Sequence, residues 1–387
     1  MTRVLYVAYP LLTVSDESAG GAEQVLWTLE HEMARREMAR RKTGQMNVLA
    51  TVAASAGSRV SGELFSTGEP CTQRDDYDRR RTEHEDQVVE LVRRRAREGK
   101  PFDLIHDMSG SFWRRAAQLE VPVLATLHLP RSFYSPESFE NVPSNTSFSC
   151  VSQSQSRSFA DLDTMLSVVP NGIALEKFGL DIAGVEQNSA ERKGLLWLGR
   201  ICEEKAPHLA LEIAKRAGLP ITIAGQVYPF SYHQQYFDRE VAPRLQQSAN
   251  ATLVSTPSFA TKRRLLREAR ALLITSQADE TSSLVAMEAA ASGTPVITFR
   301  RGALPEVVKE GVTGFVVEDV ASAMEACGRI QTIRNAVCVA HAQENFSSAK
   351  MADDYADLYS RILQTPMEVP VSIKHAETAT EYSRQDL

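Results

Sequence analysis

The sequence predicts an α/β protein built of two doubly wound, Rossmann-like domains, each with a parallel sheet. Apolar runs of strand length alternate with amphipathic stretches of about 10–15 residues, which is typical of parallel strands joined by helical crossovers. This alternation begins near the N-terminus and starts again near residue 193. The chain has 387 residues, which is enough for two domains with separate cores.

The first domain is predicted over residues 1–167. It opens with RVLYVAY (3–9), a continuous apolar run as expected of a strand that is buried on both faces. A helix is predicted from Gly21, and the stretch 55–80, rich in glycine, serine and charge, is interpreted as a loop. The remaining predicted strands are 47–54, 103–107, 122–128, 147–152 and 167–172, with helices at 82–98 and 111–118.

The second domain is predicted over residues 168–345, with the join to the first domain in the stretch 173–192. Its predicted strands are 193–199, 220–225, 251–255, 271–276, 295–299 and 314–317, and its helices are 207–218, a segment within 231–247, 262–269, the segment around Glu288 and 304–311. Residues 346–365 are expected to form a helix that returns toward the first domain, and the polar tail 366–387 is expected to be mobile.

Composition excludes several classes of protein. The net charge is −6, so the chain has no general attraction for nucleic acid. No apolar stretch reaches the roughly 18 residues of a membrane-spanning helix, and the N-terminus is interpreted as a strand rather than a signal peptide. The five cysteines are odd in number and form no CxxC pair, so we expect them to be reduced and buried in a cytoplasmic protein.

The stretch ADETSSLVAMEAAASGTPVITF carries the first functional prediction. Glu280 lies in the loop after the predicted strand 271–276, at the carboxyl edge of a parallel sheet, where open α/β sheets bind ligands. A helix is predicted to start near Ser282 or Ser283, with Thr281 or Ser282 as its N-cap.

The first turn of that helix is predicted to bind an anion. The backbone N–H groups of Ser283, Leu284 and Val285 have no intrahelical partner there and can receive a phosphate. Glu288 lies further into the helix among apolar residues. A buried carboxylate needs donors such as the hydroxyls of a ribose, whereas an exposed helix face is the alternative interpretation.

Two cations follow the predicted strand 193–199 in the stretch GRICEEK. Arg200 and Lys205 are therefore also expected at a carboxyl strand end, and two cations beside a helix N-terminus suit a diphosphate. In the alternative interpretation they pair with Glu203 and Glu204 in a solvated loop.

A glycine pair follows the first predicted strand, in SAGGAEQ (18–24). Gly20 and Gly21 allow a ligand to approach the backbone closely, although two glycines at a strand–helix junction are a weak indication. The GxGxxG fingerprint of dinucleotide binding is absent, which disfavours a dehydrogenase.

Taken together, these motifs resemble the retaining glycosyltransferases of family 4. The resemblance covers about residues 3–363. It is carried by the Glu280–Glu288 pair, the Arg200–Lys205 spacing, the GGAE loop, VPNGI (169–173) and RGALPEVVKEGVTGFVV (301–317). It implies the GT-B fold, in which two Rossmann-like domains with parallel sheets face each other across a cleft that binds a nucleotide sugar.

The resemblance also implies roles for individual residues. Glu280 would contact the transferred sugar near its 3-hydroxyl, and Glu288 would hold the ribose hydroxyls. Arg200 and Lys205 would bind the donor diphosphate, and His128 would lie near the transferred sugar. The residues whose backbone or loop would contact the donor are Gly20, Gly21, Gly225, Ser283, Leu284 and Val285.

The implied function is transfer of a hexosyl group, with retention, from a UDP- or GDP-sugar to an unidentified hydroxyl acceptor, in glycan, glycolipid or small-molecule glycoside synthesis. UDP is the favoured nucleotide. No metal site or further cofactor is expected, because the two cations can replace a divalent ion. The alternatives are another GT-B activity, such as a sugar-nucleotide epimerase, and a non-catalytic nucleotide-sugar-binding protein. Ser282-Ser283 and Gly302-Ala303 stand where the family has Phe-Gly and Gly-Gly, which puts the identity of the donor sugar in doubt.

For three further features the sequence allows two interpretations each. His106 and Asp107 end a predicted strand, where they could serve an acceptor hydroxyl or, for the aspartate, cap the next helix. The aromatic segment 227–237 could line a base pocket, but packing is favoured. Arginine clusters alternate with acids, which favours solvated helix faces over weak contact with anionic lipid. These clusters are 35–41, 79–81 and 93–97.

Overall fold

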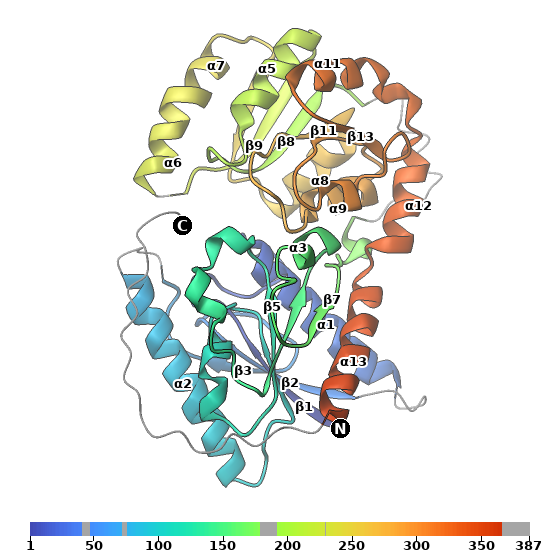
Figure 1. Ribbon diagram of the computed structural model, residues 1–387. Helices are drawn as coiled ribbons and strands as arrows, with labels where there is room; N and C mark the ends of the chain where they lie inside the picture. The colour runs from blue at the N-terminus through green and yellow to red at the C-terminus, as the bar shows by residue number, and fades with distance from the viewer. Residues whose placement is uncertain (41–46, 72–75, 179–191, 229, 366–387) are drawn as a thin grey trace. The chain divides into compact units, whose positions relative to one another are not determined.

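The computed structural model describes residues 1–40, 47–71, 76–178, 192–228 and 230–365 (Figure 1). The chain divides into two compact units. Unit 1 comprises Met1–Gly172 together with the chain from Ser348 onward, and unit 2 comprises Ile173–Ser347. None of the helices in the described ranges is long and apolar enough to cross a membrane.

Unit 1 contains a seven-stranded parallel sheet in the order β3-β2-β1-β4-β5-β6-β7. The four residues from Val4 to Val7 in the first strand are fully buried, as predicted for a strand covered on both faces. The strands are β1 (Thr2–Val7), β2 (Val48–Ala54), β3 (Glu63–Ser66), β4 (Leu104–Asp107), β5 (Val123–Leu127), β6 (Thr146–Cys150) and β7 (Leu166–Val168). The helices are α1 (Gly21–Arg40), α2 (Tyr77–Arg97), α3 (Gln153–Arg157), α13 (Ser348–Gln364) and the 3₁₀ helices η2 (Phe112–Gln118), η3 (Arg131–Phe133) and η4 (Pro136–Phe139).

Two local predictions in unit 1 are wrong. The stretch 55–80 is not all loop, since it contains β3 and the start of α2. β3 is a short edge strand whose side chains are half-buried or exposed, so it lacks the apolar run that marks a central strand. The segment 111–118 forms the 3₁₀ helix η2 instead of an α-helix, and its start is held by Asp107, which accepts a hydrogen bond from the Trp113 N–H at 2.9 Å.

Unit 2 contains a six-stranded parallel sheet in the order β10-β9-β8-β11-β12-β13. The strands are β8 (Leu195–Arg200), β9 (Ile221–Gln226), β10 (Ala251–Ser255), β11 (Ala271–Ile274), β12 (Val296–Phe299) and β13 (Gly314–Val317). The helices are α5 (Pro207–Ala217), α6 (Ser231–Tyr236), the π-helical turn η7 (Phe237–Val241), α7 (Ala242–Gln246), α8 (Phe259–Glu268), α9 (Leu284–Ala291), α10 (Leu304–Val307), α11 (Val320–Arg329), α12 (Asn335–Asn345) and the 3₁₀ helices η5 (Leu175–Lys177) and η8 (Ile330–Thr332).

The strand order of unit 2 confirms the doubly wound prediction, but its last helices differ from the sequence-based expectation. The predicted helix 304–311 ends after α10, because Val308 adopts an extended conformation. α11 and α12 were not anticipated, although α11 begins with a readable signal. Asp319 accepts a hydrogen bond from the Ser322 N–H at 2.9 Å, and the Ser322 hydroxyl accepts one from the Asp319 N–H at 3.1 Å, which is a capping box.

Buried hydrogen bonds fix α13 to the sheet of unit 1. His106 Nδ1 lies 2.7 Å from the Tyr359 hydroxyl, and His106 Nε2 lies 2.7 Å from Thr126 Oγ1, which also lies 3.0 Å from the Tyr355 hydroxyl. Burial lowers the pKa of His106 to about 3, so the ring is neutral. The structure therefore assigns His106 to helix docking and gives no support to a role at an acceptor hydroxyl, while Asp107 caps η2.

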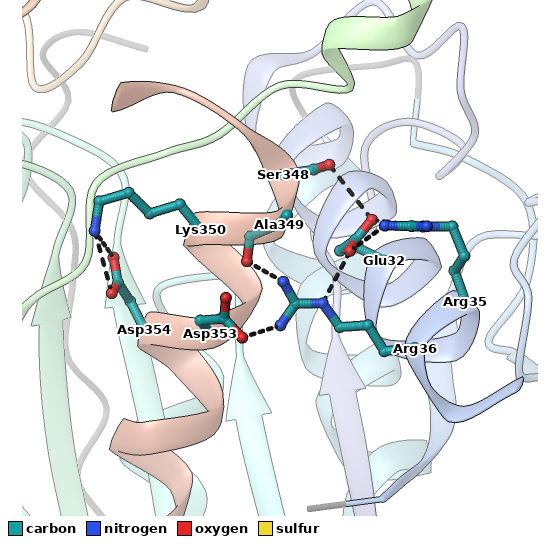
Figure 2. Close-up of polar contacts among 8 residues, drawn as sticks. All are labelled: Glu32, Arg35, Arg36, Ser348, Ala349, Lys350, Asp353 and Asp354. Atoms are coloured by element: carbon teal, nitrogen blue, oxygen red, sulfur yellow. Dashed lines mark hydrogen bonds and ion pairs between the residues drawn. The ribbon is translucent and has the colours of Figure 1, made fainter. Parts of the chain in front are cut away.

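Charged side chains form a second contact between α13 and α1 (Figure 2). Arg36 is buried, and its guanidinium binds Glu32 Oε1 at 2.8 Å, Asp353 Oδ1 at 2.5 Å and the Ala349 carbonyl oxygen. Arg35 binds Glu32 from the other side at 2.7 Å. Burial alone would raise the pKa of Glu32, but the hydrogen bonds from both arginines hold this pKa below its usual value.

We predict that Arg36→Met destabilises unit 1 by about 1–3 kcal/mol. The Glu32 carboxylate and the Ala349 carbonyl oxygen of α13 would each lose a buried, charged hydrogen-bond donor. The matched control is Lys350→Met, which removes an exposed pair with Asp354 within α13 and should cost less than about 0.5 kcal/mol. Urea unfolding measures both free energies of unfolding. Equal destabilisation by both substitutions would contradict the assignment.

The contribution of Glu32 to stability should also depend on pH. Because the folded-state pKa of Glu32 is depressed, this contribution is present above the unfolded pKa of about 4.3 and is lost as the pH falls from there through the folded-state pKa.

Candidate functional site

The neighbouring strands β8 and β11 mark the point where the strand order of unit 2 reverses. They pair in parallel, with Leu195 opposite Ala271 and Trp197 opposite Leu273. Their carboxyl ends therefore lie at the same edge of the sheet, and open α/β sheets bind ligands in the crevice outside this edge. Arg200 is the last residue of β8 and Glu280 follows β11, as predicted from the sequence.

An ion pair connects the loops that follow these two strands. Lys205 Nζ lies 2.5 Å from Glu280 Oε1, and the Ser276 hydroxyl also donates to this oxygen. The lysine side chain is 29% exposed and the glutamate side chain is 13% exposed, so the pair is partly shielded from solvent while remaining accessible. The structure thus brings together Lys205 and Glu280, which the sequence analysis assigned to the same nucleotide-sugar donor, at one edge of the sheet.

The loop after β12 fixes the backbone of Glu280. The Ala303 N–H donates to the Glu280 carbonyl oxygen at 2.7 Å, and the Gly302 N–H donates to Asp279 Oδ1 at 3.2 Å. Gly302 has a φ of +52°, and a Cβ atom there would lie 2.2 Å from the Glu280 carbonyl oxygen. Only glycine fits this close approach, so Gly302 positions the loop that carries Glu280.

The helix α9 begins at Leu284, and Ser283 is its N-cap, so the predicted caps Thr281 and Ser282 are wrong. Ser283 has an extended backbone and its hydroxyl accepts a hydrogen bond from the Ala286 N–H at 3.3 Å, which is the geometry of a cap. This cap occupies the third N–H of the helix. The N–H groups of Leu284 and Val285 have no intrahelical acceptor and remain suited to an anion.

Glu288 is buried on α9 with an exposure of 4%, so its exposed-face alternative is wrong. Lys262 of α8 lies 2.6 Å from Glu288 Oε1. Glu288 Oε2 is also out of solvent, and within the described part of the chain no group donates to it. A shielded carboxylate oxygen without a donor is costly, and a ligand hydroxyl would satisfy it. The sequence did not identify Lys262 because the two residues are distant along the chain.

Arg200 lies at the open side of this edge. Its side chain is 42% exposed, its guanidinium lies 3.3 Å from Glu204 Oε1, and it covers the ring of Tyr228 at 5.7 Å from the ring centre. The alternative prediction that Glu203 and Glu204 neutralise both cations therefore holds only for Arg200 and Glu204, since Lys205 binds Glu280. An exposed ion pair of this kind contributes little and can exchange its acid for a phosphate.

A buried arginine that the sequence did not single out supports α9 from its far end. Arg192 donates to Thr294 Oγ1 at 2.5 Å and to the Ser292 carbonyl oxygen at 2.7 Å, directly after the helix. It also donates to the Ala269 carbonyl oxygen, after α8, at 3.2 Å. Burial lowers the pKa of Arg192 to about 10, so the group stays charged at neutral pH and stabilises the carbonyl ends of both helices.

Gly225 is required by the sheet. A Cβ atom on Gly225, in β9, would lie 1.9 Å from the carbonyl oxygen of Gly199 in the neighbouring β8. Strand pairing alone explains a glycine here, so its predicted contact with a donor remains a proposal.

The other predicted residues belong to unit 1. α1 begins at Gly21, and a Cβ atom on Gly20 would lie 2.0 Å from Glu23 Oε2. Glu23 is buried in the first turn of α1, and burial raises its pKa to about 7. His128 follows β5 with its Nε2 out of solvent, and burial lowers its pKa to about 4, so this ring is neutral at neutral pH. The sequence pointed to the GGAE stretch but not to Glu23 as a buried acid.

Comparison with known proteins finds relatives for the part of the chain that carries this site. Residues 182–336 match the family model of the glycosyl transferases group 1. A stretch of 125 residues is 36% identical to a D-inositol 3-phosphate glycosyltransferase of Mycolicibacterium paratuberculosis, and it covers 31% of this chain and 27% of that protein. The enzyme of the same name from Mycobacterium bovis is 33% identical over 128 residues, which are 33% of this chain and 26% of that protein. The chain thus spans about a quarter of the length of the curated relatives it matches.

Solved structures match over most of the chain and show that the fold is GT-B. Sucrose-phosphate synthase from Thermosynechococcus elongatus has a TM-score of 0.72 at 18% identity, covering 94% of this chain and 99% of that one. Anabaena Alr3699/HepE, in complex with UDP and glucose, has a TM-score of 0.69 at 17% identity, covering 93% of this chain and 100% of that one.

We predict that Gly302→Ala displaces Glu280. Gly311→Ala is the matched control, because Gly311 also has a positive φ, of +69°, but no atom within 4 Å of a Cβ position. The positive φ should cost each variant about 1–2 kcal/mol of stability through backbone strain. Gly302→Ala should lose additional stability, because its Cβ atom also collides with the backbone of Glu280. Thermal unfolding measures the difference. If the two variants are equally stable, the loop after β12 does not constrain Glu280.

Proposed function

From the premise that residues 182–336 carry a glycosyl transferases group 1 domain, we propose that the protein is a retaining glycosyltransferase. It moves a hexosyl group from a nucleoside diphosphate sugar, with UDP favoured over GDP, to a hydroxyl acceptor. The observation that supports this most is the group of anion-binding features at the carboxyl ends of β8 and β11: Arg200, Lys205 and the free first turn of α9.

In this proposal the donor diphosphate binds Arg200, Lys205 and the N–H groups of Leu284 and Val285. Both cations hold carboxylates in the free protein, Arg200 on Glu204 and Lys205 on Glu280. The diphosphate takes the place of Glu204 on the exposed arginine. Lys205 lies between the leaving phosphate and Glu280, which then contacts the transferred sugar. The two cations neutralise the diphosphate, so the chemical step requires no divalent ion.

The ribose of the donor is held by Glu288. Lys262 fixes one oxygen of this carboxylate at 2.6 Å, and the other oxygen, shielded and without a donor in the described residues, accepts a hydrogen bond from a ribose hydroxyl. Gly225, at the end of the neighbouring strand β9, precedes the loop on the base side. Strand pairing requires a glycine at this position, and the absence of a side chain also leaves room for a planar base at the end of the strand.

The transfer step follows from charge placement. The bond between the anomeric carbon and the phosphate oxygen breaks, and negative charge develops on the phosphate, where Lys205, Arg200 and the helix N–H groups stabilise it. The acceptor hydroxyl attacks from the same face, and its proton passes to the leaving phosphate oxygen. The configuration is therefore retained without a carboxylate nucleophile.

Unit 1 supplies the groups expected around the sugar and acceptor. Gly20 and Gly21 offer backbone N–H groups to the diphosphate, and His128, neutral at neutral pH, forms a hydrogen bond with the transferred sugar. The acceptor is a hydroxyl compound of glycan, glycolipid or small-molecule glycoside synthesis in the cytoplasm. No residue described here selects among these acceptors.

The proposal is tested without knowing the acceptor. The protein is incubated with UDP-α-D-hexoses and GDP-hexoses, and slow hydrolysis of the donor is followed by proton NMR. Early release of the α-anomer from an α-linked UDP-hexose supports a retaining transferase. Release of the β-anomer contradicts retention, an epimerised nucleotide sugar indicates an epimerase, and binding without turnover in acceptor-rich extract indicates a non-catalytic binder.

We predict that Arg200→Ala and Lys205→Ala each weaken UDP binding by about 1.5–3 kcal/mol, or roughly 10- to 150-fold in Kd. Lys205→Ala should have the larger effect, because it also leaves the Glu280 carboxylate uncompensated beside the phosphate. Adding Glu280→Gln to Lys205→Ala should recover part of the affinity. Calorimetry measures each variant, with Lys215→Ala on the exposed face of α5 as the control. Unchanged affinity in both single variants would remove the assignment.

We predict separate roles for the two glutamates. Glu288→Gln should raise the Kd of UDP and the KM of the donor together, because the ribose does not change during the reaction. Glu280→Gln should spare the Kd of UDP and lower kcat, because it contacts the sugar on which charge develops. Lys262→Met controls for loss of the ion pair with Glu288. Equal loss of UDP affinity with equal kcat in both glutamate variants would show a single binding element.

A further inference from the structure

Three side chains of metal-ligand type meet in unit 2, and two of them lie between Arg200 and Lys205 in the loop after β8. They are Cys202 and Glu204, in that loop, and His233 of α6. The Cys202 sulfur, a Glu204 carboxylate oxygen and a His233 ring nitrogen all lie within 4.8 Å of one another. Cys202 and His233 are buried, with exposures of 0% and 1%, and Glu204 is half-buried, so this group is not a cluster of surface charges.

His233 is the second observation that points to a ligand. Neither of its ring nitrogens has a hydrogen-bond partner within the described residues, although both are out of solvent. The rings of Tyr228, Phe230 and Tyr232 surround it at centroid distances of 6.1, 5.5 and 4.3 Å, and they exclude water from the imidazole. Packing alone leaves two buried polar atoms unsatisfied, whereas a metal ion would bind the lone pair of one of them.

We propose that Cys202, Glu204 and His233 bind one Zn²⁺ ion. A thiolate, a carboxylate and a neutral imidazole together balance its charge of two, and a soft sulfur with a ring nitrogen favours zinc over magnesium or calcium. At zinc–ligand distances of about 2.0–2.3 Å, tetrahedral ligand atoms are roughly 3.3–3.8 Å apart, so the three side chains need only a small contraction. Water fills the fourth position.

The surrounding groups are consistent with this ion. The Cys202 thiol donates to the Arg200 carbonyl oxygen at 3.5 Å, and deprotonation on metal binding releases that contact. In the free protein Arg200 lies 3.3 Å from Glu204 Oε1, so its guanidinium then orients the carboxylate as an outer partner of the site. The ion would join the loop that carries Arg200 and Lys205 to α6. This site uses residues of unit 2 alone and does not depend on the proposed transferase function. It departs from the prediction, made from the sequence, that the chain has no metal site.

Cobalt substitution tests the proposal by a readout that needs no activity. The full chain is treated with chelator, dialysed and titrated with Co²⁺, followed by Zn²⁺. We expect saturation at one equivalent, with a thiolate-to-cobalt charge-transfer band in the near ultraviolet and intense visible bands of a four-coordinate ion, all displaced by Zn²⁺. Zn²⁺ should also raise the melting temperature, because it binds only the folded protein.

Variants assign the ligands. Cys202→Ser should abolish the charge-transfer band although the other four cysteines remain, and His233→Ala should weaken Co²⁺ binding by at least about tenfold. Cys327→Ala, which removes a buried thiol on α11, should leave the band unchanged. Melting of each metal-free variant checks that it is folded. Absence of the band at one equivalent, or a band that survives in Cys202→Ser and in His233→Ala, overturns the proposal.

Discussion

The ion pair between Lys205 and Glu280 depends on the parallel pairing of β8 with β11, and the rest of the candidate site is arranged around it. Parallel strands end at one edge, so the residues that follow them are brought within contact distance although they are far apart in sequence. In the free protein the two charges satisfy each other at 2.5 Å. A ligand that carries both a diphosphate and hydroxyl groups offers a replacement partner to each of them.

The site can act only if its backbone is held in place, and three contacts hold the loop of Glu280 and both ends of α9. Gly302 lets the loop after β12 pack closely against the Glu280 carbonyl, because any Cβ atom at this position would collide with the carbonyl oxygen. Ser283 closes the first turn of α9 with its hydroxyl and leaves two N–H groups for an anion. Arg192 fixes the other end of α9, which keeps Glu288 at a constant depth. Positioning of this kind on rigid elements is what electrostatic stabilisation of a leaving group requires.

The sequence predicted the features that depend on local pattern. Buried central strands have continuous apolar runs, so β1, β8 and β11 were found from the sequence, and their order along the chain implied the doubly wound sheets. Strand-end placement then located Arg200, Lys205 and Glu280. The edge strand β3 was missed because it is short and partly exposed, and α11 was missed although its capping box is readable in the sequence.

What the sequence could not supply is contact between distant residues. Nothing local distinguishes Lys262 as the partner of Glu288, His106 as the residue that anchors α13, or His233 as the neighbour of Cys202. The most direct test of the account is a crystal structure of the protein with UDP. The account predicts phosphate oxygens about 2.7–3.2 Å from Lys205 and from the first N–H groups of α9, with a ribose hydroxyl at Glu288. UDP bound elsewhere, with the phosphates away from Lys205 and α9, would contradict it.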